Sequence, residues 1–280
     1  MNAIHIKSMT PGVAIVTGGS KRIGKSIVKK LSFLGWKVII HYNTNSIAAK
    51  NLKNQIIKRK GKAAIIKCDL NNNNSVKDLI EKSKKKFGNI SLLIINASIF
   101  EYDNLSSVDL ESWERHINSN LRAAVFLTQK FAEQAPQMNN SNDELPCTDS
   151  NVINMIDQRV RKLNPEFMTY TIAKMGLWAF TQTAAQALAP KIRVNAIGPG
   201  PTLKGSRQSP EHFSKQRSET VLGRGSNSRD IVKALEYIVK SPAITGQIFC
   251  VDGGQHLNWR TADVLGTCLL YTSDAADEGL

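Results

Sequence analysis

The sequence predicts an α/β fold in which helices cover both faces of one doubly wound parallel sheet. Short apolar runs alternate six or seven times with helix-length amphipathic segments, the order that produces parallel strands joined by helical crossovers. A length of 280 residues, 41% of them hydrophobic and 21% charged, suits one globular domain of this class. We therefore expect a single domain over residues 13–258, preceded by an N-terminal extension of residues 1–12.

The predicted strands are short apolar runs, each followed by a segment with helical spacing. The run at residues 92–95 is Leu-Leu-Ile-Ile, which is typical of a strand buried on both faces of a parallel sheet. We expect strands at residues 13–16, 37–42, 63–67, 92–95, 152–156 and 192–197, with a closing strand within 246–254. We expect helices at residues 26–34, 48–59, 76–87, 112–134, 168–188 and 230–240.

Three segments show neither pattern. Residues 136–151 are rich in Asn, Asp, Ser and Pro and predict a surface loop. Residues 204–227 show no hydrophobic period, and a loop of that length in a compact domain is more often a substrate lid than slack, so we expect a substrate loop. Residues 266–280 resemble a translation of sequencing-adapter DNA, and we expect a non-native or disordered tail without function.

The charge and cysteine content argue against several classes of function. The net charge of +14 and the pI of 9.7 raise nucleic acid as a partner. However, the lysines are spread over expected helices, so we expect no nucleic-acid partner and read the charge as favouring an anionic cofactor or substrate. The four cysteines form no disulfide or metal-binding pattern, which favours the cytoplasm. No apolar run approaches the roughly 20 residues of a membrane helix.

A glycine-rich turn connects the first strand to the first helix. Strand, turn and helix form the context of a dinucleotide-binding loop, because glycines admit the pyrophosphate and the helix N-terminus offers N–H groups to it. An ordinary turn between a strand and a helix is the alternative. The residues that we expect to line the cofactor here are Gly18, Ser20, Lys21, Arg22, Ile23 and Gly24.

The end of the second strand indicates which nicotinamide cofactor is used. Sites that prefer NAD place an acidic residue near this position to bind the ribose 2′-hydroxyl. Residues 41–46 contain no acid, so His41, Tyr42 and Asn43 should tolerate a 2′-phosphate, with Lys21 and Arg22 as nearby cations. This favours NADPH over NADH.

Tyr170 and Lys174 lie four residues apart in a predicted helix, so they share one helix face. The ammonium group should lower the pKa of the phenol from about 10, which makes Tyr170 a proton donor near neutral pH. Most such pairs are a core aromatic residue beside a solvated lysine. The pair therefore gains its meaning from the motifs around it.

Five motifs resemble those of the short-chain dehydrogenase/reductases and occur in the same order. They are the pattern T-G-x-x-x-[G/R]-I-G at residues 17–24, Asn96-Ala97, Asn120, the Tyr170/Lys174 pair, and Arg193-Val194-Asn195 with Pro199-Gly200. The resemblance implies an NADP-dependent oxidoreductase with a Rossmann fold, whose active site lies at the carboxyl ends of the strands. It also implies a homo-oligomer, either a tetramer or a dimer.

The resemblance further implies roles for single residues. Tyr170 would be the general acid, Lys174 would lower its pKa and hold the nicotinamide ribose, and Asn120 would anchor a relay water at a local helix distortion. Asp69 would meet the adenine. The other implied cofactor contacts are Leu70, Asn96, Ala97, Ser98, Pro199 and Gly200.

One position departs from the family pattern. The family's serine lies thirteen residues before the tyrosine, where this chain has Asp157. A serine hydroxyl donates to a ketone oxygen, whereas an aspartate accepts from, or exchanges protons with, a substrate N–H, which favours a C=N substrate. A negative Asp157 should also raise the pKa of Tyr170 and oppose Lys174, so the groups should titrate jointly.

Asp157, the Lys21-Arg22 turn and the segment Asn96-Ala97-Ser98-x-Phe100 together resemble the pteridine reductases. This resemblance implies reduction of a pterin with NADPH. Phe100 would stack on the pterin, Ser98 and Arg22 would touch cofactor phosphate and pterin, and Asp157 with Tyr170 would deliver the proton. The alternatives are a carbonyl reductase acting on a 3-oxoacyl thioester and a catalytically silent NADP-binding sensor.

Overall fold

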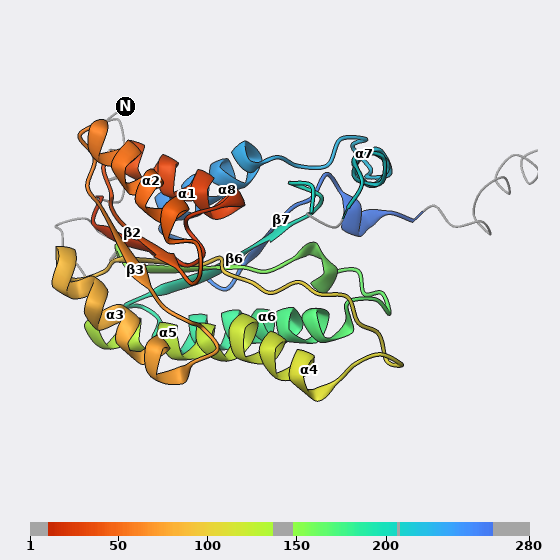
Figure 1. Ribbon diagram of the computed structural model, residues 1–280, viewed down its shortest axis with the longest axis horizontal. Helices are drawn as coiled ribbons and strands as arrows, with labels where there is room; N and C mark the ends of the chain where they lie inside the picture. The colour runs from red at the N-terminus through yellow and green to blue at the C-terminus, as the bar shows by residue number, and fades with distance from the viewer. Residues whose placement is uncertain (1–10, 137–147, 206–207, 260–280) are drawn as a thin grey trace, which may run out of the picture.

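The computed structural model describes residues 11–136, 148–205 and 208–259, which form one seven-stranded sheet between two layers of helices (Figure 1). Most of the expected N-terminal extension, most of the 136–151 loop and the whole 266–280 tail lie outside the described residues. Those three expectations stay predictions. Within the described ranges, no helix combines the length and the apolar character needed to cross a bilayer.

The sheet order is β3-β2-β1-β4-β5-β6-β7, and all neighbouring strands are parallel. The strands are β1 (Val13–Val16), β2 (Lys37–Tyr42), β3 (Ala63–Lys67), β4 (Leu92–Ile95), β5 (Asn151–Met155), β6 (Arg193–Pro199) and β7 (Ile248–Val251). The chain builds outward from β1 to β3 and then starts the other half at β4. In open α/β sheets, ligands bind beyond the carboxyl ends of the strands at such a switch point.

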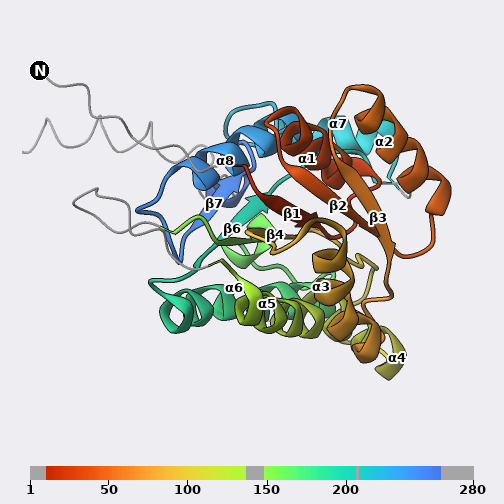
Figure 2. The same cartoon turned by 90° about the vertical axis from the view of Figure 1, so that its left-hand side faces the viewer.

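Helices cover both faces of the sheet (Figures 1 and 2). One layer contains α1 (Arg22–Phe33), α2 (Ser46–Lys58) and α8 (Ser228–Lys240). The other layer contains α3 (Asn73–Phe87), α4 (Leu110–Ile117), α5 (Ala123–Gln134) and α6 (Met168–Leu188). The expected doubly wound parallel sheet is therefore confirmed.

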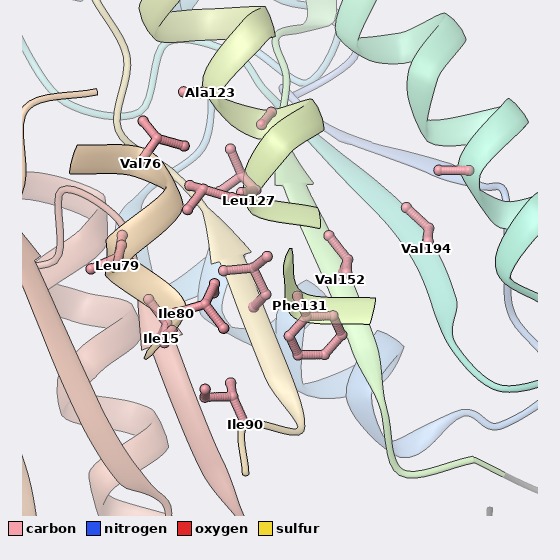
Figure 3. Packing of buried hydrophobic residues seen from close by; sticks show 14 of the residues in the cluster. Ile15, Val76, Leu79, Ile80, Ile90, Ala123, Leu127, Phe131, Val152 and Val194 are labelled. Carbon is pink, nitrogen blue, oxygen red and sulfur yellow. The ribbon is translucent and has the colours of Figure 1, made fainter. Parts of the chain in front are cut away.

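Each face of the sheet buries its own apolar core. Successive residues of a strand point to opposite faces, so Val38 and Ile40 of β2 join one core while Ile39 joins the other. Figure 3 shows part of the second core, where Phe131 of α5 and Ile80 of α3 lie over the sheet. Both side chains are fully buried. Close packing of this kind holds the strand ends in fixed positions.

Most predicted elements occur in the structure, several with their ends shifted by a few residues, but two segments differ. The four strands expected between residues 13 and 95 and the helix at 168–188 begin and end as predicted. The helix expected at 112–134 is instead α4, a π-helical segment η1 (Asn118–Arg122) and α5. The 204–227 segment is not a continuous loop, because it contains α7 (Pro210–Ser218). Two short 3₁₀ helices, η2 (Gln158–Val160) and η3 (Gln255–Leu257), were not predicted.

The missed helix α7 has a simple physical explanation. It buries none of its residues, so it leaves no hydrophobic period in the sequence. Its start does carry a local signal. Ser209 accepts a hydrogen bond from the His212 N–H, and Pro210 occupies the first turn, which is a typical helix N-terminus.

Candidate active site

Segments that follow four strands meet at the carboxyl edge of the sheet. Thr17 follows β1, Asn96 follows β4, Asp157 lies two residues beyond β5, and Pro199 ends β6. The Thr17 hydroxyl accepts from the Asn96 N–H at 2.7 Å and from the Ala97 N–H at 2.9 Å. The Asn96 side chain in turn donates to the Thr17 carbonyl at 2.8 Å. These bonds hold the ends of β1 and β4 together at the switch point.

The glycine turn after β1 has no room for a side chain at Gly18 or Gly24. Gly18 has a φ of +60°, and a Cβ on it would lie 3.1 Å from the Ala97 Cα. A Cβ on Gly24 would lie 2.4 Å from the Gly18 carbonyl oxygen. The N-cap of α1, Lys21, offers the first N–H groups no side-chain acceptor, and the first turn holds no acidic residue. This uncapped helix N-terminus fits an anionic pyrophosphate.

Arg22 occupies the position where the family pattern usually has glycine. Its φ is +49°, in the left-handed region that non-glycine residues rarely adopt. Its guanidinium group donates to the carbonyls of Leu203 and Lys204, both at 2.9 Å. Arg22 therefore joins the glycine turn to the segment that leads into α7, a connection that the sequence does not reveal.

The placement of His41 corrects the expectation that it contacts the cofactor directly. The side chain is only 2% exposed. Its Nδ1 lies 2.9 Å from the Gly18 N–H, and its Nε2 lies 3.0 Å from the Cys68 carbonyl. Both ring nitrogens are thus used inside the protein, beneath the glycine turn. Burial is the main cause that lowers the pKa of His41 below 6.5.

The remaining residues expected near the adenine lie at the ends of β2 and β3. Asp69 is partly exposed, and its Oδ1 accepts from the Asn71 N–H at 3.0 Å and from the Asn43 side chain at 3.4 Å. Leu70 has its side chain in the apolar core, so only its backbone faces this edge. Asp69 and Asn43 therefore lie side by side at this edge.

The Tyr170 hydroxyl donates to Asp157 Oδ2 at 2.9 Å. Tyr170 and Lys174 lie one turn apart on α6 and are 5% and 2% exposed. The Lys174 ammonium donates to the Met155 carbonyl at 2.8 Å and lies 5.5 Å from the centre of the Tyr170 ring. Asp157 Oδ1 accepts from the Arg159 N–H at 2.9 Å. The phenol, the amine and the carboxyl group thus meet at the carboxyl end of β5.

The electrostatics of this group differ from the simple expectation for a tyrosine beside a lysine. Burial, followed by the negative charge of Asp157 and their shared hydrogen bond, raises the pKa of Tyr170 well above 10. Burial also raises the pKa of Asp157 and lowers the pKa of Lys174 to about 8. The net shift of the Tyr170 pKa is therefore opposite to the lowering expected from Lys174 alone. The opposing effect predicted for Asp157 is confirmed.

Asn120 lies in the π-helical segment η1, which provides the local helix distortion that the family resemblance implies. Its side chain is buried and bonds both ways to Ile99. Oδ1 accepts from the Ile99 N–H at 2.8 Å, and Nδ2 donates to the Ile99 carbonyl at 2.9 Å. The Asn120 side chain therefore fixes the segment that carries Ser98 and Phe100, a contact that the sequence did not predict.

An aromatic cluster lies beside the Tyr170 hydroxyl. Phe100 is 51% exposed and stacks on Phe167, with ring centres 4.3 Å apart and planes 5° apart. Phe100 also meets Tyr170 edge to face at 4.7 Å. The Arg159 guanidinium lies 5.0 Å from the Phe167 ring centre. Phe167 was not expected at the site, because its left-handed φ of +56° leaves no clear signal in the sequence.

Asp103 is a second residue that the sequence analysis missed. It is 2% exposed, and its two carboxyl oxygens each lie 3.2 Å from the Thr169 N–H. Its carbonyl accepts from the Phe167 N–H at 2.8 Å. Asp103 therefore caps the start of α6 one residue before Tyr170. The family motifs do not include it, and an Asp that is distant in sequence from the helix gives no local capping signal.

The chain is similar to known oxidoreductases along most of its length. A family model described as "Enoyl-(Acyl carrier protein) reductase" matches residues 18–256. A 3-oxoacyl-[acyl-carrier-protein] reductase from Synechocystis is 30% identical over 256 residues, which cover 88% of this chain and 98% of that protein.

Two solved structures extend the comparison. The FolM alternative dihydrofolate reductase 1 from Brucella suis, in complex with NADP, is 40% identical, with a TM-score of 0.84 over 91% of this chain and 99% of that one. A short-chain dehydrogenase from Burkholderia cenocepacia, also with NADP, shares the fold at 24% identity and a TM-score of 0.80, covering 89% of this chain and 99% of that one. The chain therefore belongs to the short-chain dehydrogenase/reductase family of oxidoreductases.

Proposed function

We propose that the protein is an NADPH-dependent reductase that reduces a C=N bond of a pterin or dihydropterin-like substrate. The observation that carries this proposal is the hydrogen bond from the Tyr170 hydroxyl to Asp157. It puts a carboxyl group where the family pattern has a serine. A carboxyl group accepts from ring N–H groups and exchanges protons with them, which suits a nitrogen heterocycle better than a ketone.

The geometry supports a dinucleotide at the carboxyl edge of the sheet. The closely packed glycine turn and the uncapped N-terminus of α1 would hold the pyrophosphate. Asp69 and Asn43 would face the adenosine, and the absence of an acid in residues 41–46 favours NADPH. The other residues that we assign to the cofactor are Ser20, Lys21, Arg22, Ile23, Gly24, Tyr42, Leu70, Asn96, Ala97, Ser98, Lys174, Pro199 and Gly200.

In this proposal the chain's own residues supply the proton. When bound, the cofactor would supply a hydride, and reduction of a C=N bond would also need one proton at the nitrogen. Tyr170 is held protonated by its high pKa and lies against Asp157, so the pair can pass one proton to the nitrogen. Lys174 would hold the nicotinamide ribose, and the distorted helix at Asn120 would anchor the water that reprotonates the pair.

The aromatic cluster supports a flat substrate. Phe100 already packs face to face on another ring, so a pterin of similar shape could stack on it beside the Tyr170 hydroxyl. The similarity to a protein named alternative dihydrofolate reductase, whose structure contains NADP, supports the same substrate class. Residues 204–227, with α7, would form the substrate loop. The homo-oligomer and the cytoplasmic location stay predictions.

The second candidate is reduction of a 3-oxoacyl thioester. The similarity to the Synechocystis 3-oxoacyl-[acyl-carrier-protein] reductase favours it, whereas Asp157 at the serine position argues against it. A catalytically silent NADP-binding sensor is the third hypothesis. The presence of Tyr170, Lys174 and Asn120 together argues against it, because a sensor would not need all three.

One experiment separates these readings. NADPH absorbance is followed in parallel with dihydrobiopterin, dihydrofolate and an acetoacetyl thioester, with NADH as the control cofactor. We expect turnover of a pterin or folate with NADPH. Turnover of the thioester alone would exclude the pterin substrate. Tight NADPH binding without any turnover would support the sensor.

A further inference from the structure

His41 joins two backbone segments beneath the proposed cofactor site. Its ring lies between the glycine turn after β1 and the end of β3. Nδ1 lies 2.9 Å from the Gly18 nitrogen, and Nε2 lies 3.0 Å from the Cys68 carbonyl oxygen. The His41 backbone carbonyl also accepts from the Gly19 N–H at 3.0 Å. One residue of β2 therefore binds two successive N–H groups of the turn.

These two contacts fix the tautomer of the ring. The Gly18 N–H is a donor, so Nδ1 must carry a lone pair and no proton. The Cys68 carbonyl is an acceptor, so Nε2 must carry the proton. Only the neutral ring with its proton on Nε2 satisfies both partners. An imidazolium would set a second N–H against that of Gly18.

The surroundings of His41 favour this neutral form. The ring is 2% exposed, and the buried positions of α1, α2 and α3 hold no titratable side chain. Burial has the largest effect on the pKa of His41 and lowers it, whereas the hydrogen bond to the Cys68 carbonyl and the charge of Asp69, just beyond β3, raise it less. The nearby Cys68 thiol stays neutral, because burial raises its pKa to about 12.

We propose that His41 is a positioning residue for the cofactor, which holds Gly18 in its left-handed conformation and so keeps the glycine turn open to the pyrophosphate. Gly18 has a φ of +60° and packs closely against Ala97, so the turn has little room to adopt another backbone conformation. The Nδ1 acceptor holds the Gly18 N–H toward the sheet. The Gly18 carbonyl oxygen then keeps its place next to Gly24 in the first turn of α1.

This role has a consequence for cofactor binding at acid pH. Protonation of His41 removes the acceptor for Gly18, so the affinity for NADPH should fall as the pH drops below the normal histidine range. Because the pKa of His41 is lowered in the folded protein, the neutral form also contributes stability above pH 6.5. That contribution is lost as the pH falls through the lowered pKa.

The role of His41 rests on the proposed cofactor, but the first measurement that tests it does not depend on that cofactor. Two-dimensional ¹H–¹⁵N spectra of the imidazole nitrogens in the cofactor-free protein report the tautomer. We expect the signature of an unprotonated Nδ1 and a protonated Nε2 for His41 at pH 7. A proton on Nδ1 would overturn the proposal, whatever the protein binds.

Binding variants then test the role in the turn, with NADPH affinity measured directly by fluorescence. His41→Leu removes both contacts and should raise the NADPH Kd about tenfold, equivalent to about 1.4 kcal/mol. His41→Asn restores an acceptor near the Nδ1 position and should recover most of that loss. Both variants should lose the acid-dependent rise in Kd that the wild-type protein shows.

A matched control separates positioning from general destabilisation. Gln134 is also buried, and its side chain accepts from the Ile90 N–H and donates to the Ile90 carbonyl. Ile90 lies just before the start of β4, at the end of the strand away from the proposed site. Gln134→Leu should lower the melting temperature and leave the NADPH Kd unchanged. A folded His41→Leu variant with wild-type affinity would overturn the proposal. If the wild-type protein binds no NADPH, the cofactor assignment fails and the spectra alone decide the His41 contact.

Discussion

Replacing Asp157 by serine, the residue usual in the family, tests the proposed chemistry most directly. The change removes the carboxyl group that accepts from the Tyr170 hydroxyl at 2.9 Å. General acid–base catalysis contributes about 10²–10⁴-fold to the rate. Because Tyr170 remains as a donor, we expect the loss near the lower end of that range, about 10²-fold in kcat with a dihydropterin, or about 2.7 kcal/mol in the barrier.

The effect on NADPH binding should be much smaller. The hydrogen-bond partners of the Asp157 side chain are the Tyr170 hydroxyl and the Arg159 N–H, and neither belongs to the glycine turn. The pKa of Tyr170 should also fall, because the nearby negative charge that helps to raise it is gone. The alkaline limb of the kcat profile should therefore move to lower pH.

Single-turnover rates with a dihydropterin and fluorescence measurements of the NADPH Kd test this prediction. Asp157→Asn is the matched control, because it keeps the shape and an acceptor but exchanges no proton, and it should lose as much kcat as Asp157→Ser. Equal losses of turnover and NADPH affinity would show that Asp157 is structural. Wild-type turnover in Asp157→Asn would refute the proton-exchange role.

Substitutions at three further positions test the surrounding residues. Tyr170→Phe keeps the ring contact with Phe100 but removes the proton donor, so kcat should fall by about 10²–10⁴-fold while the melting temperature changes little. Lys174→Met should abolish the part of the pH dependence of stability that comes from the buried amine. The pKa of Lys174 in the folded protein is about 8, below the usual 10.5. The free energy of unfolding of the wild-type protein, measured in urea, should therefore increase relative to that of the variant as the pH rises from 8 to 10.5. It should show no such increase below pH 7. Asp103→Ala removes the cap of α6 and should cost about 1 kcal/mol of stability. It should also lower kcat without changing the NADPH Kd. Asp103→Asn keeps an acceptor and should lose less stability and less kcat. An unchanged kcat in a folded Asp103→Ala protein would show that the cap does not position Tyr170.

The strands could be predicted almost to the residue because of their composition. Runs such as residues 13–16 and 92–95 are apolar, and each is bounded by polar or glycine-rich segments. Elements that bury little surface could not be predicted in the same way. Helix α7 buries none of its residues. The π-helical segment Asn118–Arg122 adds one residue to a helical turn, and this does not visibly change the apolar pattern of the sequence.

The residues of the candidate site likewise fall into those that the sequence could place and those that it could not. Motif spacing was enough to place Tyr170, Lys174 and Asp157 at one edge of the sheet, because consecutive parallel strands present their carboxyl ends together. The spacing could not show that His41 points inward to Gly18, because a residue at a strand end can face either the ligand or the core.

By itself, the sequence determined the sheet, its helical layers, the family and the edge at which the polar residues gather. These follow from apolar periodicity and local turn chemistry, which act between neighbours along the chain. Only the tertiary structure decided the hydrogen bond between Tyr170 and Asp157, the two backbone contacts of the His41 ring and the cap that Asp103 provides for α6. Each of these depends on burial and on partners distant in sequence, and both arise only when the chain has folded.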